Sequence, residues 1–303
     1  MRRFGAHVGG GLARIPARAQ AIGAECVQIF ASAPQDWRPP AHDPAVVAAF
    51  RDGLEAHAIA PVLLHGIYLL NPASTDAVLV ARSVEAIVAD LVWADRLGAA
   101  AVVIHLGSAG REPLEPALER CADALLSALS RYDGPASLLL ETCAGQGATV
   151  GRRFEDLGYL LDRLDERAGV CFDTCHVFAA GYDISAENGL AATIEDLDHA
   201  VGLARVQALH VNDSKRALGS NLDRHENLGD GLIGEIGFRR LLHHPAFATQ
   251  PLILEVPGLA GDGPDRENLN RLRRWAGAPP LSDPGDAEGR LPPAPVDRLT
   301  GRE

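Results

Sequence analysis

The 303-residue chain has no apolar run that approaches the roughly 20 residues a membrane-spanning helix requires. Its start, MRRFGAHVGG, carries two arginines but no apolar segment behind them, as a secretory signal would need. Cysteine is scarce, with an odd count of five and no pair in CxxC spacing, which argues against a disulfide framework. These absences predict a soluble protein of the reducing cytoplasm with no membrane partner.

Positive charge is also in short supply. The chain has 28 Lys and Arg against 40 Asp and Glu, a formal net charge of -12. Proteins that bind duplex DNA ordinarily present a basic face that neutralises phosphates. The acidic balance therefore argues mildly against a nucleic-acid partner. It does not decide the matter, because local charge governs such contacts and many of the acids could be metal ligands.

Eight short runs, most of them apolar throughout, predict strands of a parallel sheet buried on both faces. They span residues 3–8, 26–30, 59–64, 100–105, 136–141, 169–173, 206–211 and 251–256. Patterns between them predict helices over residues 44–57, 74–97, 113–131, 154–164 and 236–243, with Ser74 capping the second. Eight strands alternating with helices favour an α/β fold, the (β/α)8 TIM barrel, with a doubly wound sheet as the alternative.

The end of the chain has a different composition. From residue 277 it is rich in proline, glycine and charge and shows no apolar periodicity. This composition predicts a loosely ordered, Pro-rich tail over residues 277–303. Residues 1–276 are then expected to form a single barrel domain.

Nine side chains of the kinds that bind metals stand at the downstream ends of the apolar runs or in the loops after them. They are His65, His105, Glu141, Asp173, His176, His210, Asp223, His225 and Glu255. In a TIM barrel, the loops at the carboxyl ends of the strands build the active site, so the pattern places all nine on one rim. Any one of them alone would more often be a structural residue. Six consecutive strands that each offer one indicate a centre of two or three ions.

The ligand types indicate the chemistry of that centre. Mixed imidazole and carboxylate ligands suit Zn²⁺, with Mn²⁺ or Fe²⁺ as alternatives. Paired ions of this kind clamp a phosphodiester from both sides, so the predicted reaction class is hydrolysis of phosphate esters.

Several segments around these residues resemble endonuclease IV, the metal-dependent deoxyribonuclease of the apurinic/apyrimidinic (AP) endonuclease family 2. The most specific are VCFDTCHVFAAGYDI (170–184) and GSNLDRHENLGDGLIG (219–234). They are joined by LHGIYLLNPAS (64–74), VVIHLGS (102–108), ETCAGQGATVG (141–151), LHVNDSK (209–215) and PLILEVP (251–257). The resemblance runs from residue 5 to about residue 275, so it implies that residues 1–276 form the catalytic domain.

The resemblance also implies a mechanism. The family is a TIM barrel with three zinc ions that cleaves double-stranded DNA 5′ to an abasic site during base excision repair, leaving a 3′-hydroxyl. A hydroxide that bridges two ions would be the nucleophile, with Glu141 and Glu255 as the catalytic residues. The implied ligand sets are His65, His105 and Glu141; Glu141, Asp173, His210 and Glu255; and His176, Asp223 and His225. A monomer is expected.

DNA contacts are implied in the same way, for Gln35, Trp37, Tyr68, Leu69, Lys215 and Arg224. Members of the family distort abasic DNA with side chains inserted through the minor groove. One of these is usually an Arg two residues before a Trp, but in ASAPQDWRPP that position holds Gln35. The segment that contains Tyr68 and Leu69 matches the second insertion loop.

A single-metal sugar isomerase or epimerase on the same type of barrel is the alternative function. Such enzymes commonly hold one ion with two Glu, an Asp and a His, as Glu141, Glu255, Asp173 and His210 would. They have no need of the five further ligand-type residues.

Overall fold

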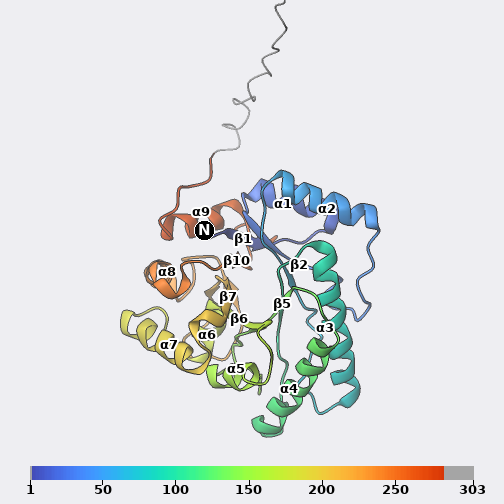
Figure 1. Ribbon diagram of the computed structural model, residues 1–303. Coiled ribbons are helices and arrows are strands. Elements are labelled where there is room, and N and C mark those ends of the chain that lie inside the picture. Colours follow the sequence, from blue (N-terminus) through green and yellow to red (C-terminus); the bar gives the residue numbers. More distant parts are fainter. Residues whose placement is uncertain (1, 283–303) are drawn as a thin grey trace, which may run out of the picture.

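Eight parallel strands close into a barrel in the computed structural model, which describes residues 2–282 (Figure 1). The strands follow one another around the barrel in chain order, and the last of them pairs with the first. They are β1 (Phe4–His7), β2 (Cys26–Phe30), β3 (Val62–His65), β4 (Ala101–Ile104), β5 (Ser137–Glu141), β6 (Ala168–Asp173), β7 (Val206–His210) and β10 (Leu252–Leu254). The predicted TIM barrel is confirmed, and each predicted apolar run contains one strand or overlaps it.

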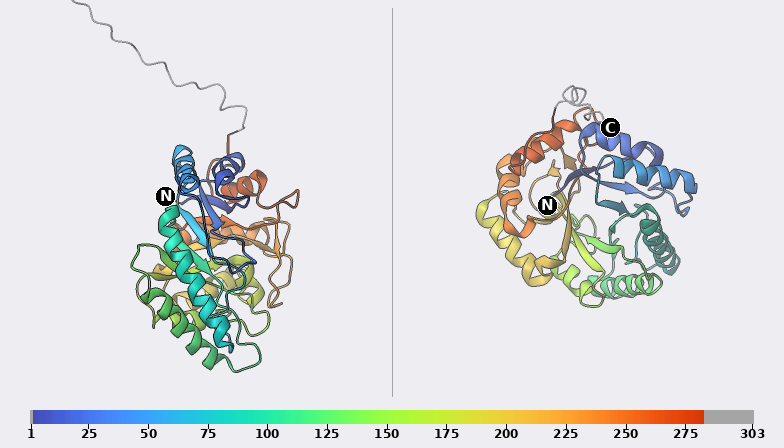
Figure 2. Two further views of the ribbon diagram at one scale, coloured as in Figure 1. Left: turned by 90° about the vertical axis from the view of Figure 1, so that its right-hand side faces the viewer. Right: turned by 45° about the horizontal axis from the view of Figure 1, so that its top comes forward.

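Helices surround the barrel as an outer ring, which is clearest in the right-hand view of Figure 2. They are α1 (Ile15–Ile22), α2 (Pro44–Ala56), α3 (Ala77–Leu97), α4 (Leu114–Ser130), α5 (Phe154–Leu161), α6 (Thr174–Ala180), α7 (Glu187–Ala200), α8 (Gly234–His243) and α9 (Arg266–Trp275). Within residues 2–282, no helix is both long and apolar enough to cross a membrane. The prediction that Ser74 caps α3 is wrong. Asp76 is the cap, because its carboxylate accepts hydrogen bonds from the backbone N–H groups of Val78 and Leu79.

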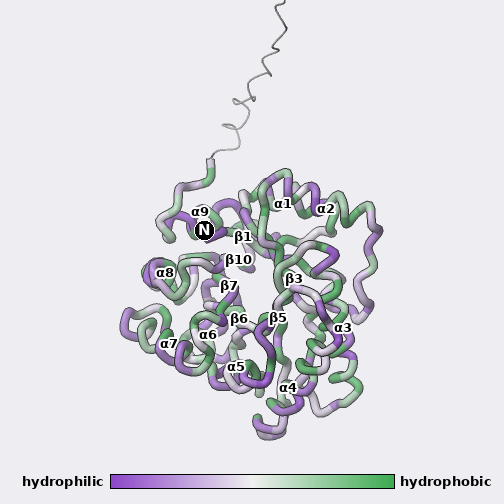
Figure 3. The backbone as a smooth tube through the Cα atoms, viewed as in Figure 1, coloured by the Kyte–Doolittle hydropathy of each residue, from purple (hydrophilic) through white to green (hydrophobic). Residues whose placement is uncertain are grey.

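Two apolar layers hold the barrel together. The larger lies between the strands and the helices, where α3 buries Val84, Ile87 and Leu91. The tube in Figure 3 accordingly shows hydrophobic and hydrophilic residues mixed along the outer helices. The smaller layer fills the inside of the barrel and consists of Cys26, Leu63, Ala101, Val103, Leu139, Cys171, Ala208 and Ile253. The polar residues of the site lie directly above this inner layer, toward the carboxyl ends of the strands.

The described part of the predicted tail, residues 277–282, packs beside α9. The backbone N–H of Leu281 donates to the Asn270 side chain at 2.9 Å, and the Leu281 side chain packs against the core. The guanidinium of Arg273 donates to the carbonyl of Pro279 at 2.7 Å. The rest of the predicted tail, residues 283–303, lies outside the described residues.

Candidate metal centre

A ring of eight polar residues crowns the inner apolar layer, one from each barrel strand or from the residue after it. We call it the polar ring, and its members are His7, Gln28, His65, His105, Glu141, Asp173, His210 and Glu255. Seven of them stand two positions after a residue of the inner layer, and His7 stands two positions after Gly5. Because strand side chains alternate between faces, a residue two positions further on faces the same side. The barrel therefore directs all eight side chains to its interior at the carboxyl ends of the strands.

Three more predicted ligands reach the polar ring from the segments that follow β6 and β7. Asp173 caps α6 by accepting a hydrogen bond from the His176 backbone N–H at 2.8 Å, which fixes where His176 projects. Asp223 and His225 come from the loop between β7 and β10, which is folded back by a short antiparallel pair, β8 (Asp213–Ser214) and β9 (His225–Glu226). The structure thus brings all nine predicted ligand-type residues together.

Glu141 lies at the centre of the cluster and is fully buried. Its Oε2 is 3.3 Å from His65 Nε2 and 3.5 Å from His105 Nε2, whereas its Oε1 is 3.0 Å from His210 Nδ1. The two oxygens of one carboxylate therefore serve two different sets of imidazoles. A carboxylate placed in this way would contact an ion in each of the two sets.

Three groups of residues have ligand atoms within 4.8 Å of one another, and the first two groups share Glu141. They are His65, His105 and Glu141; Glu141, Asp173, His210 and Glu255; and His176, Asp223 and His225. These are the three sets implied by the sequence resemblance. A fourth group joins Cys175 to Asp173 and His225. Burial raises the pKa of the Cys175 thiol to about 12, so the sulfur stays protonated and is a poor ligand.

The histidine nitrogens are oriented for metal binding. The Nδ1 of His65 lies 2.8 Å from the carbonyl of Gly66, and the Nδ1 of His176 lies 2.8 Å from the carbonyl of Thr142. A carbonyl only accepts, so in both rings Nδ1 carries the hydrogen and Nε2 faces the centre. The Nε2 of His225 is buried and lies 3.2 Å from Asp223 Oδ1, without the geometry of a hydrogen bond. Inward nitrogens together with four carboxylates fit divalent cations of the zinc type.

The electrostatics favour positive charge at the centre. Burial alone would raise the pKa of Glu141, but the imidazoles of His105, His210 and His176 hold the pKa of that carboxyl well below its usual range. Burial lowers the pKa of His176, and the surrounding carboxylates, Asp173 first, outweigh it, so that this pKa lies well above its usual value. The carboxylates therefore favour a proton on imidazoles such as that of His176 wherever no cation is bound, whereas burial lowers the pKa of His105. Metal binding at this centre must displace those protons and weaken as the pH falls.

Two polar residues that hold the ligands in place were missed in the sequence. Gln28 is fully buried and contacts both His210 and Glu255. Asn212 donates to Asp173 at 2.7 Å and accepts from the backbone N–H of Glu255 at 2.8 Å. The signal for Gln28 was a lone amide inside an apolar strand, two residues after the inward-facing Cys26.

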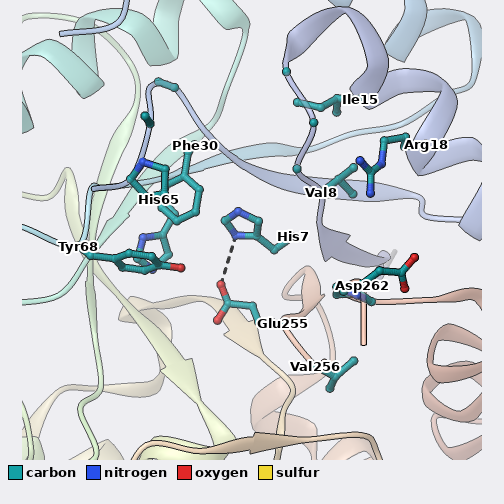
Figure 4. Close-up of a pocket in the computed structure, with 18 of the residues that line it drawn as sticks. His7, Val8, Ile15, Arg18, Phe30, His65, Tyr68, Glu255, Val256 and Asp262 are labelled. Atoms are coloured by element: carbon teal, nitrogen blue, oxygen red, sulfur yellow. Dashed lines mark ion pairs between the residues drawn. The ribbon is translucent and has the colours of Figure 1, made fainter. Parts of the chain in front are cut away.

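The centre opens into a cavity of about 1010 Å³. Figure 4 shows His7, His65, Tyr68 and Glu255 on one side of it and Arg18 on the other. Arg18 was not predicted to take part. It is exposed, it lies against Gly10, and it makes no ion pair or hydrogen bond within residues 2–282. An anion that enters this cavity therefore meets an unpaired cation.

The predicted DNA-contact residues are spread more widely than the ligands. Tyr68 lines the cavity and is 58% exposed, with its ring 6.2 Å from that of His65. Leu69 is half-buried against the core, and Gln35 is exposed. Trp37 borders a separate pocket of about 660 Å³, where the guanidinium of Arg82 stacks over its ring at 4.4 Å.

The predicted basic contacts are already partly engaged. The Nζ of Lys215 lies 3.5 Å from Glu226 Oε2. Arg224 is exposed, and its guanidinium donates only to the carbonyl of Asp223 within residues 2–282.

Comparison with known proteins gives matches over most of the chain. A family model described as xylose isomerase-like TIM barrel matches residues 16–275. The chain is 40% identical over 279 residues to a probable endonuclease 4 of Methanoculleus marisnigri, covering 90% of this chain and 99% of that protein. It is 42% identical over 274 residues to a probable endonuclease 4 of Streptomyces avermitilis, covering 88% of each.

Solved structures give two kinds of match. The crystal structure of endonuclease IV from Thermus thermophilus superposes with a TM-score of 0.79 at 40% identity, covering 91% of this chain and 99% of that one. A D-tagatose 3-epimerase-like protein superposes with a TM-score of 0.68 at only 17% identity, covering 91% and 97%. The second match shows a shared barrel and nothing more.

Proposed function

The chain belongs to the endonuclease IV family of xylose isomerase-like TIM barrels, and from this membership we propose that it is a zinc-dependent AP endonuclease. Its substrate is double-stranded DNA with an abasic site, and it hydrolyses the phosphodiester on the 5′ side to leave a 3′-hydroxyl. The observation that carries the proposal is the gathering of nine ligand-type residues in three groups, two of which share Glu141. The choice of the 5′ bond rests on family membership.

The three groups would hold three ions, one each. Glu141 belongs to the first two groups, and His176, Asp223 and His225 make up the third. Mixed imidazole and carboxylate sets of this kind suit zinc, with manganese or iron as possible substitutes. Bound at this centre, the ions supply Lewis-acid polarisation of the phosphate and activation of the attacking water.

Glu255 is placed to accept the proton of that water. Its Oε1 is held by the Gln28 amide at 2.7 Å, and its Oε2 faces His210 Nδ1 at 3.2 Å. Burial would raise the pKa of Glu255, but the neighbouring imidazoles, with His210 contributing most, hold that pKa below its usual range. The group is therefore a carboxylate at neutral pH, the form that accepts a proton.

DNA reaches the centre through the cavity in Figure 4. Arg18 and Arg224 are exposed, make no ion pair within residues 2–282 and would contact backbone phosphates, while Lys215 must first leave Glu226. Tyr68 stands exposed at the cavity edge beside His65, where it can pack against the sugar or a base next to the abasic site. Gln35 and Trp37 lie outside the cavity and serve as contacts to the flanking duplex, as does Leu69.

The remaining features of the proposal concern the protein in the cell. Residues 1–276 form the catalytic domain, which acts as a monomer in the cytoplasm.

The single-metal isomerase or epimerase remains the competing function, because proteins of that kind share the barrel. Glu141, Asp173, His210 and Glu255 alone would satisfy its needs. The further group of His176, Asp223 and His225 has no use in a single-metal site, and this favours the endonuclease.

The test combines metal content with cleavage of a duplex that carries one abasic analogue. We expect two to three zinc ions per chain and incision 5′ to the analogue. Glu141→Gln should lower metal content and reduce cleavage by several orders of magnitude while the barrel stays folded, since one carboxylate serves two ions. Glu85→Gln is the matched control, because Glu85 pairs with Arg131 on the surface, away from the centre. A single tightly bound ion with no incision would favour the isomerase.

A further inference from the structure

Gln28 is the one member of the polar ring that is neither acidic nor an imidazole. It lies in the middle of β2 and its side chain is fully buried inside the barrel. Its amide nitrogen is 2.7 Å from Glu255 Oε1 and 3.1 Å from His7 Nδ1, and its amide oxygen is 2.8 Å from His210 Nε2. All the polar atoms of this side chain are thus directed at the centre.

The direction of each hydrogen bond follows from its neighbours. The Glu255 carboxylate only accepts, so the NH₂ of the Gln28 amide must face it. The amide oxygen then faces His210, so His210 Nε2 must carry a hydrogen. This leaves His210 Nδ1 as the ligand atom, and it points between Glu141 Oε1 at 3.0 Å and Glu255 Oε2 at 3.2 Å.

His210 differs in this respect from the other buried histidines of the centre. In His65 and His176 the outward N–H donates to a backbone carbonyl, and a side-chain substitution does not remove a backbone carbonyl. They offer Nε2 to the centre, whereas His210 offers Nδ1. The orientation of His210 therefore depends on a single replaceable side chain.

We propose that Gln28 is a positioning residue of the metal centre. It sets the tautomer of His210 and the orientation of Glu255, and in this way it raises the affinity for the ion that these two residues would share. The proposal rests on the proposed metal-dependent function. Groups that hold the far nitrogen of a metal-bound histidine typically contribute about 10- to 100-fold to metal affinity. We expect a loss in that range when Gln28 loses one or both of these bonds.

Two variants separate its two bonds. Gln28→Leu removes the donor and the acceptor while filling the space. Gln28→Glu keeps an acceptor for His210 but sets a carboxylate against Glu255. Gln207→Leu is the matched control, because Gln207 lies on β7 next to Gly169 and is not a member of the polar ring.

The experiment measures zinc release to a chromogenic chelator, together with the protonation of the His210 ring by long-range ¹H–¹⁵N NMR. In the wild-type protein, His210 should carry its hydrogen on Nε2. Gln28→Leu and Gln28→Glu should each lower the affinity for one zinc ion by about 10- to 100-fold. Only Gln28→Leu should lose the protected Nε2–H signal of His210. Gln207→Leu should change neither quantity. A purely packing role would leave the Nε2–H signal intact in Gln28→Leu.

Unchanged zinc affinity in both folded variants overturns the proposal, and so does a wild-type His210 protonated on Nδ1. If Gln28→Leu fails to fold, the zinc affinity of Gln28→Glu decides the matter. Failure of the proposed function looks different. A wild-type protein that holds zinc but leaves abasic duplex uncut would refute the nuclease, while the zinc measurements would still support or refute the role of Gln28.

Discussion

Replacing Asp90 by Asn should stabilise the protein at alkaline pH, and the advantage should shrink as the pH falls. Asp90 lies on α3, is only 3% exposed, and its Oδ2 has no hydrogen-bond partner within residues 2–282. Burial raises the pKa of its carboxyl to about 7, against a small opposing effect of His65. An unpaired carboxylate in such a place costs free energy whenever it is ionised.

The size of the effect follows from the two pKa values. An unfolded chain ionises Asp near pH 3.9, whereas the folded protein holds the Asp90 proton to a pKa of about 7. The penalty therefore begins near pH 4, grows as the pH rises and is complete above pH 7. A difference of about three units corresponds to about 4 kcal/mol, of which roughly 2.5 kcal/mol develops between pH 5 and pH 8. For a domain of this size, that amounts to about 5 °C in the melting temperature.

The assay is thermal unfolding of the wild type and Asp90→Asn from pH 5 to pH 8, with both proteins at the same metal content so that competition between protons and metal cancels. Asp95→Asn is the control. Asp95 lies on the same helix but accepts a hydrogen bond from the Tyr132 hydroxyl at 2.6 Å, so its replacement should destabilise. A difference between the wild type and Asp90→Asn that stays constant with pH would refute the reasoning, because it would mean that Asp90 does not titrate in this range.

Two further predictions concern DNA. Gln35→Arg should raise the affinity for a duplex with an abasic site relative to that for an intact duplex, as measured by fluorescence anisotropy. Arg is longer than Gln and adds a positive charge at the position where members of the family usually have an Arg. The metal content should stay the same. If neither affinity nor selectivity changes, Tyr68 and Leu69 carry the recognition instead. Arg18→Ala should weaken binding and lower the salt slope by about one phosphate contact, and Asp262→Asn, in the same cavity, should strengthen binding. An unaltered salt slope for Arg18→Ala would remove Arg18 from the DNA interface.

The strands and the ligand-type residues were the predictable part of this molecule. Parallel strands are buried on both faces, so each appears as an apolar run, and a histidine or carboxylate at its end is conspicuous. Four helices were missed, and the sequence explains two of these failures. The helix α9 is polar along most of its length and buries little beyond Leu269, Leu272 and Trp275, while α6 has only seven residues. The helices α1 and α7 also went unpredicted.

Contacts between distant segments could not be predicted at all. Gln28 and His210 are separated by 182 residues of chain, and the sequence around neither residue indicates that their side chains form a hydrogen bond. The same holds for Arg18. Its sequence context resembles that of any surface arginine, and only the closed barrel places its side chain at the cavity. The pairing of Lys215 with Glu226 likewise depends on the fold, and it alters the charge that DNA would meet.

The four carboxylates of the centre also bear on the charge of the whole molecule. The chain has a formal net charge of -12 with neutral histidines, and Glu141, Asp173, Asp223 and Glu255 bring four negative charges together in one cluster. Three divalent ions would outweigh these four charges, and the protons that the ions displace from the imidazoles would offset part of the gain. Loading with metal should therefore raise the isoelectric point and make the field at the cavity mouth more positive. On this view the ions would attract polyanionic DNA as well as cut it, and an acidic protein would need no broad basic face to do so.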